Sequence, residues 1–454
     1  MTRRLLVLVA GALAVASLPR WLPNAVVTLR GRIFARVNGD EGIPIPGDLV
    51  DVARFKEVYS HPAANGRSRG AVLSDLFWYW LAPGPELHQE HLEPGERYEE
   101  VARTTRRILA RSARDIEALA ARYVADGLPA QDVRLVRLRD LMMPIWAGFF
   151  YEIVFGAPCP PAARDLIVAN ADDVVTALKC CGLRHMDRRH RLTRYLIAHL
   201  DAVPHALPAG LSIEERALYL QGTFFNTAVV QQSEAMAHLL MVLACYPGIQ
   251  ARLAADPSDA HLFDHVIDET MRMYPLFGIA HRITSAEIAV DDGVTLPAGS
   301  VLCFNYTEFH RAGYADPDRF DPDRWAALSA KDANHIPFGV AANRPCPAWH
   351  LSPVAMRVAT REILRRFALH TSAAHTRSLP SRGPCLLARR DRRPRRLTAA
   401  LAFIKARDRF EDVGRSVVQL VLGTYMVWDA RRQGLCRRYF EESASGGRER
   451  VRLG

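Results

Sequence analysis

The stretch IPFGVAANRPCPAWHLSPVAMR, residues 336–357, sets one cysteine, Cys346, between two prolines just before an apolar stretch with helical spacing. A buried thiol in a turn is the simplest interpretation, because free cysteine is among the most buried residue types. The surroundings favour a metal ligand instead. Arg344 and the start of a helix would both stabilise a thiolate, and Gly339 lets the backbone approach a flat, bulky group. Haem iron bound by a cysteine thiolate fits that arrangement.

Two further motifs lie upstream in the chain. In DETMRMYP, residues 268–275, Glu269 and Arg272 are one helical turn apart, where a salt bridge can form. In FDPDRW, residues 320–325, Arg324 follows a Pro-containing turn. Between them, residues 281–311 alternate in polarity and carry turn residues, which predicts short strands.

In this order, the three motifs resemble those of the cytochrome P450 family, over about residues 30–392 and most strongly over 260–367. The resemblance implies haem b as cofactor, with Cys346 as the axial ligand of its iron. It also implies a structural cluster of one glutamate and two arginines beneath the ligand loop: Glu269, Arg272 and Arg324. The other haem-binding residues that it implies are Arg344, Phe338, Gly339, Arg282, His310 and His91.

The chain departs from the family pattern in two places. Phe338 precedes Cys346 by eight residues instead of seven, and the second loop glycine is absent. The central helix lacks the usual acid–threonine pair, which delivers protons to iron-bound oxygen in the family. Counting back from Pro247 places the alcohol position at Gln231. We therefore expect Asn226 and Gln231 to line the distal pocket as catalytic residues with an altered proton supply.

The composition is that of a globular protein, with 454 residues, 49% apolar and 24% charged. The predicted fold class is mainly α with a small β subdomain, as in the cytochrome P450 fold. The hydrophobic periodicity predicts helices over 97–127, 137–155, 163–200, 212–255 (one very long helix and a short one), 260–273 and 348–368. We expect an N-terminal anchor and hinge at 1–25, a catalytic domain at 26–392 and a basic helical extension at 393–454.

The apolar run at 5–18 has fourteen residues, fewer than the roughly 20 that span a bilayer. It would suit a signal peptide or a short membrane anchor followed by a Pro-containing hinge. The family resemblance favours the anchor and a membrane-associated protein on the cytoplasmic side. For the extension at 397–440, docking against the body and lying on a membrane surface are both compatible with the pattern; docking is the default.

The predicted function is a haem-thiolate oxidase of the monooxygenase type, acting on an apolar small molecule such as a natural-product or lipid intermediate. It would use O2 and electrons from a ferredoxin or flavoprotein, which the net charge of +10 would attract. A peroxygenase, isomerase or dehydratase, or an inactive P450-like helper protein, are the alternatives. The arginines lack the interleaved aromatic residues that single-stranded nucleic acid needs, so no nucleic-acid partner is expected.

Overall fold

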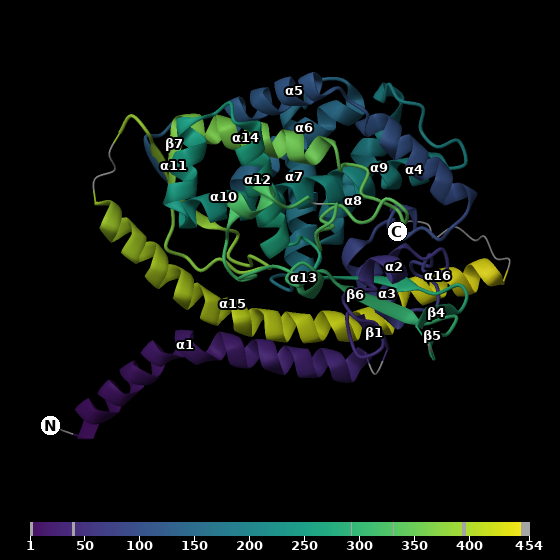
Figure 1. Ribbon diagram of the computed structural model, residues 1–454, viewed down its shortest axis with the longest axis horizontal. Coiled ribbons are helices and arrows are strands. Elements are labelled where there is room, and N and C mark those ends of the chain that lie inside the picture. The colour runs from purple at the N-terminus through teal and green to yellow at the C-terminus, as the bar shows by residue number, and fades with distance from the viewer. Residues whose placement is uncertain (1–2, 39–40, 292, 330, 393–395, 446–454) are drawn as a thin grey trace.

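The computed structural model describes residues 3–38, 41–291, 293–329, 331–392 and 396–445. The ends of the predicted anchor and extension (1–2 and 446–454) lie outside the described residues. The body is a packed group of helices with small sheets at its edges: β1, β4, β5 and β6 lie at one end, and β7 lies at the other end beside α11 (Figure 1). The predicted class, mainly α with a small β part, is therefore confirmed.

One long helical element runs through the middle of the body. It consists of α9 (Ile213–Leu220), the π-helical stretch η3 (Gln221–Ala228) and α10 (Val229–Cys245). Ser212 begins it with a reciprocal capping box to Glu215. Its neighbours in the core are α6 (Leu138–Phe155), α7 (Pro161–Leu178), α11 (Pro247–Ala255), α12 (Ala260–Met273) and α14 (Leu351–Arg366).

Two predicted helices are each split in the structure. The helix expected over 97–127 is α4 (Glu96–Leu109) and α5 (Ala113–Gly127), because Ser112 caps a new helix by accepting the backbone N–H of Asp115. The helix expected over 163–200 is α7 and α8 (Met186–Ala198), followed by the short η2 (Leu200–Ala202). Cys180, with φ at +55°, turns the chain between α7 and α8.

Three small sheets flank the helices. The first has the order β1 (Ile43–Ile45), β6 (Val301–Asn305), β3 (Ile279–Ile283), with β6 parallel to β1 and antiparallel to β3. The second is β2 (Val133–Arg137), β8 (Pro384–Arg389), β7 (Phe367–His370), and the third pairs β4 (Ile288–Asp291) with β5 (Val294–Leu296). The remaining short helices of the body are α2 (Phe55–Ser60), α3 (Val72–Leu81), η1 (Pro85–Leu87), α13 (Tyr306–Phe309) and η4 (Pro322–Ala326).

The two ends of the chain meet along one edge of the body. Helix α1 (Arg3–Asn38) continues past the expected hinge, with Pro19 and Pro23 inside it, and it bends partway along (Figure 1). Helix α15 (Leu397–Gln433) runs in the same direction, with α1 on its outer side. α15 and α16 (Leu435–Ala444) both pack against α3. The extension therefore docks against the body, as the first of its two interpretations predicts.

Candidate functional site

A tight loop presents Cys346. The backbone N–H of Cys346 donates to the carbonyl of Phe338 at 2.8 Å, and the carbonyl of Cys346 accepts from Trp349 at 3.2 Å. Gly339 and Arg344 both have positive φ, +74° and +52°. Glycine adopts that conformation at little cost, whereas an arginine there is uncommon. These contacts fold the chain between 338 and 346 into a closed loop ahead of α14.

The sulfur of Cys346 lies in a desolvated environment. Burial raises the pKa of the Cys346 thiol to about 11, although the backbone N–H of Ala348 donates to the sulfur and opposes this. The guanidinium of Arg344 points elsewhere: it donates to the carbonyl of Leu92 at 2.5 Å and lies 3.6 Å from the ring centre of Tyr98. The structure therefore does not bring Arg344 to the sulfur. A thiolate at neutral pH needs a metal ion on the sulfur itself.

A pair of buried arginines forms a cationic cradle, which we define as Arg67 and Arg282. Arg282, on β3, donates to the hydroxyl of Tyr59 at 2.8 Å. The carboxylate of Glu90 lies 2.8 Å from Arg282 Nη1 and 3.9 Å from Arg67 Nη1. Burial raises the pKa of Glu90 to about 7, with Arg344 opposing the shift. The Nε atoms of both cradle arginines are buried without a hydrogen-bond partner among the described residues.

Asn343 fastens the ligand loop to the cradle. Its Nδ2 donates to the carbonyls of Tyr59 at 2.7 Å and Ala64 at 2.9 Å, and its Oδ1 accepts from Arg67 Nη2 at 2.7 Å. Asn343 belongs to the loop that is one residue longer than the family pattern. Sequence analysis did not single out Asn343, Arg67 or Glu90, because their contacts join segments that are far apart in the chain.

The segment 88–92 lies between the ligand loop and the central helix. His88 Nε2 and the hydroxyl of Thr227 are 2.6 Å apart. Burial lowers the pKa of His88 to about 4, so this imidazole is neutral at pH 7. His91 is buried, its Nδ1 has no hydrogen-bond partner among the described residues, and its ring lies 5.5 Å from that of His88.

The central helix turns the predicted catalytic residues in different directions. Asn226 accepts a hydrogen bond from Asn170 on α7, and it belongs to a buried network of amides. Gln231 is half-buried one turn after Thr227. Its neighbour Gln232 faces α14, where its Oε1 accepts from Ser352 at 2.6 Å. Thr227, rather than Asn226, therefore contacts the segment beside the ligand loop.

The structure brings together the three residues of the predicted structural cluster. Glu269 accepts from Arg272 through both carboxylate oxygens, each at 2.8 Å, and from Arg324 Nε at 3.1 Å. Trp325 Nε1 and the backbone N–H of Asp321 also donate to Glu269, each at 3.0 Å. This cluster holds the loop 319–325 against α12.

His310 belongs to this layer instead of the cradle. Its Nε2 accepts from the backbone N–H of Ile336 at 3.0 Å, and its carbonyl accepts from Arg272 at 3.3 Å. Burial lowers the pKa of His310, and the neighbouring His335 adds to the shift. The structure therefore places His310 behind the start of the ligand loop and does not bring it to Glu90, the partner of Arg282.

Comparison with known proteins accounts for this geometry. A family model described as cytochrome P450 matches residues 208–393. Cytochrome P450 135B1 of Mycobacterium tuberculosis is 32% identical over 156 residues, which are 32% of this chain and 33% of that protein. The crystal structure of CYP175A1 from Thermus thermophilus shares the fold with a TM-score of 0.58 at 16% identity, covering 73% of this chain and 87% of that chain. Residues 208–393 therefore match the cytochrome P450 family, and the body has the cytochrome P450 fold.

Two further relatives illustrate the breadth of this P450 match. Cyclooctat-9-en-7-ol 5-monooxygenase of Streptomyces melanosporofaciens is 27% identical over 141 residues, 27% of this chain and 30% of that protein. Cytochrome P450SP alpha, solved with bound ibuprofen, has a TM-score of 0.60 at 17% identity, covering 74% of this chain and 88% of that chain. The chain thus spans about a third of the length of the curated relatives that it matches.

The residues of this site fit a haem. Cys346 would supply the soft sulfur ligand that haem iron accepts, and the cradle would supply unpaired N–H donors for carboxylates. Cys346 and Glu90 are both half-buried. Glu90 does not match, because its carboxylate competes with those of a haem for the same two arginines.

Proposed function

We propose that this protein is a haem-thiolate oxidoreductase of the monooxygenase type, acting on an apolar small molecule with O2. The observation that supports it is the closed loop around Cys346 facing the cradle of Arg67 and Arg282. In this assignment Cys346 binds the iron, and Phe338 and Gly339 shape the loop. When bound, haem b supplies the oxygen-activating chemistry.

The chain's own residues have three tasks in this proposal. Arg282 and Arg67 hold the carboxylates of the cofactor, and Glu90 leaves the cradle or is protonated when they bind. The ring of His91 packs beside that of His88, with the ring centres 5.5 Å apart. Thr227 and the neutral His88, 2.6 Å apart, hold a proton on the segment facing the ligand loop. They take the place of the acid–threonine pair that the central helix lacks, with Gln231 one turn further on.

The proposed substrate is a mainly hydrocarbon small molecule. The relative named cyclooctat-9-en-7-ol 5-monooxygenase acts on a molecule of this class, which supports the proposal. The electron donor is a ferredoxin or a flavoprotein, attracted by the basic charge. α1 contains a helical stretch, Leu5–Ile33, that is long and apolar enough to cross a membrane, and we place the catalytic body on the cytoplasmic side.

A second candidate function is a haem-thiolate enzyme that needs no electron donor: a peroxygenase, isomerase or dehydratase. One observation favours it. Asn226 is engaged by Asn170, and Gln232 by Ser352, so these polar side chains of the central helix are committed to structural contacts. A helper protein without catalysis is the third candidate, and it requires that Cys346 bind no haem.

The absorption spectrum of the reduced, carbon-monoxide-bound protein tests the proposal. Thiolate ligation gives a strongly red-shifted Soret band, which Cys346→Ala abolishes and which the control Cys245→Ala, at an exposed cysteine, retains. Absence of haem from the purified protein would refute both enzymatic candidates. Turnover of an apolar substrate with a reductase supports the monooxygenase; turnover with hydrogen peroxide alone supports the second candidate.

A further inference from the structure

Helix α15 carries an exposed apolar stripe. Its five members are separated along the chain by seven, seven, four and seven residues, so their side chains fall on one narrow face of the helix. The stripe extends from 403 to 428, about 38 Å at 1.5 Å per residue. All of its members are 44% to 60% exposed, and together they define the α15 stripe: Phe403, Phe410, Val417, Val421 and Trp428.

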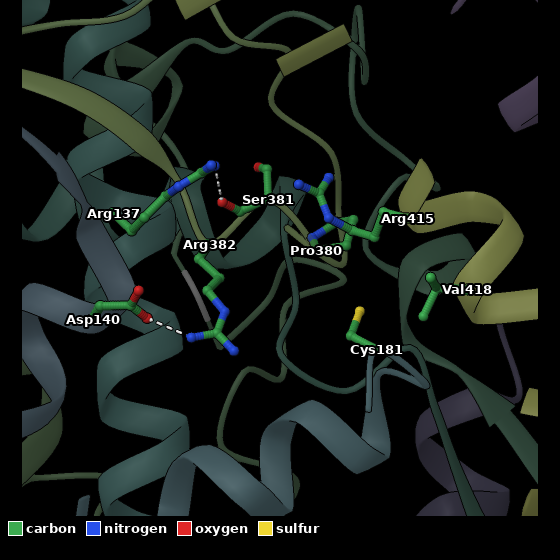
Figure 2. Close-up of a pocket in the computed structure, with 8 residues that line it drawn as sticks. All are labelled: Arg137, Asp140, Cys181, Pro380, Ser381, Arg382, Arg415 and Val418. Atoms are coloured by element: carbon green, nitrogen blue, oxygen red, sulfur yellow. Dashed lines mark hydrogen bonds and ion pairs between the residues drawn. The ribbon is translucent and has the colours of Figure 1, made fainter. Parts of the chain in front are cut away.

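The opposite face of α15 is fixed to the body by an ion pair and a hydrogen bond. A cavity of about 300 Å³ lies under the helix, and Figure 2 shows Arg415 of α15 lining it together with Arg137 and Arg382. Arg137 of β2 pairs with Glu411 of α15 at 2.7 Å, and Gln419 of α15 donates to the carbonyl of Lys179 at 2.8 Å. These contacts fix the orientation of α15 about its own axis, so that the stripe faces away from the body.

The charges that border the stripe are positive. Arg409, which directly precedes Phe410, is exposed. The guanidinium of Arg407 lies 5.7 Å from the ring centre of Phe403, and that of Arg432 lies 5.5 Å from the ring centre of Trp428. The acidic residues of the helix turn inward instead: Asp408 and Asp429 are 2% and 4% exposed, and the half-buried Glu411 and Asp412 pair with arginines. Aromatic and aliphatic side chains bordered by cations are typical of a helix that lies in the interface of an anionic bilayer.

Helix α1 packs along α15 and is also apolar. From Arg3 to Asn38 it has no acidic residue. Its Leu5–Ile33 stretch has no buried residue in its most apolar window, and α1 packs along α15 near Gly423, where Arg30 approaches. An apolar helix that inserts into a bilayer would bring the helix packed against it to the bilayer surface.

We propose that the α15 stripe is a lipid-binding surface that seats the protein on a bilayer containing anionic phospholipid, with α15 in the plane of the interface and α1 anchoring it. The chemistry recognised is a hydrocarbon layer under phosphate headgroups. A second copy of this chain is the competing occupant, because heptad spacing also suits helix pairing. It is disfavoured since the two stripes would bring like charges together along their borders.

Quenching by brominated phospholipids tests the proposal on the full-length chain. Protein bound to vesicles of phosphatidylcholine and phosphatidylglycerol is compared with Trp428→Phe and with Trp349→Phe, a matched control because Trp349 is 61% and Trp428 58% exposed. We expect quenching that Trp428→Phe removes in part and Trp349→Phe leaves unchanged. Equal quenching in wild type and Trp428→Phe overturns the proposal.

Charge reversal provides a second readout that does not depend on tryptophan. The variant Arg409→Glu replaces an exposed cation and is expected to weaken binding to anionic vesicles at least about fivefold, while binding to pure phosphatidylcholine changes little. A variant that binds both vesicle types like wild type contradicts the proposal. A second result would also contradict the proposal: the lipid-free protein forms a dimer that Val421→Glu dissociates, and vesicles do not quench Trp428. In that case the stripe would pair two chains.

Discussion

Replacing Glu269 by glutamine is predicted to destabilise the body strongly. Its carboxylate is fully buried and accepts five hydrogen bonds, from Arg272 (two), Arg324, Trp325 and the backbone of Asp321. The amide has one acceptor oxygen and turns an NH2 group toward the arginines, so a buried cation loses its partner. Breaking a buried pair from one side costs about 3–5 kcal/mol, and we expect a loss of that size in the free energy of unfolding.

The chain contains a matched control for this experiment. Glu362 and Arg365 on α14 have the same order, the same three-residue spacing and the same 2.8 Å distance as Glu269 and Arg272, but Arg365 is 63% exposed. An exposed pair of this kind contributes roughly 0.3–0.5 kcal/mol. Urea unfolding followed by tryptophan fluorescence measures both variants. Equal losses for Glu269→Gln and Glu362→Gln would refute the reasoning, because burial is the difference between the two pairs.

Three further predictions follow from other contacts. Burial alone would raise the pKa of Glu234, but Arg139 and Lys179 outweigh burial and hold that pKa at about 2. The free energy of unfolding of the wild type is therefore expected to fall by about 3 kcal/mol as the pH falls from 4.5 to 2. The variant Glu234→Gln should lose much less over the same pH range. Asn343→Ala removes three hydrogen bonds of about 1 kcal/mol each, so the free energy of unfolding should fall by about 2–3 kcal/mol and bound haem should dissociate faster; an unchanged dissociation rate contradicts its clamping role. Thr227→Val removes the hydroxyl next to His88 and should lower turnover at least about tenfold while the substrate-induced spectral shift keeps its midpoint; a parallel loss of substrate binding would indicate a structural role instead.

The parts of the site that sequence predicts well are those set by local geometry. Glu269 and Arg272 are three residues apart in a helix, so their side chains share a face whatever surrounds them, and the structure joins them. The ligand loop is similarly local, because Gly339 and the residues around Cys346 determine its turns. Helix ends were less predictable: the caps at Ser112 and the turn at Cys180 interrupt patterns that look continuous in apolar spacing.

The contacts around the cradle could not be predicted from the sequence, because the two arginines and their partners Glu90 and Asn343 come from four separate segments. Arg67 and its partner Asn343 are 276 positions apart in the sequence, and Arg282 and its partner Glu90 are 192 positions apart. No periodicity relates such residues; only the packing of β3 and the ligand loop brings them together. The same reasoning explains His310, whose ring satisfies the backbone N–H of Ile336 and so lies apart from Arg282.

One short segment contacts both the central helix and the cradle. His88 lies against Thr227 of the central helix, and Glu90 pairs with Arg282 of the cradle. With Glu90 ionised, the cradle of two arginines carries a net charge of about one; with Glu90 protonated it carries two. Because burial raises the pKa of Glu90 to about 7, the carboxyl gives up its charge more readily than an exposed glutamate would. Segment 88–90 is therefore where this chain adjusts both the binding of an anionic group and the polarity beside the central helix.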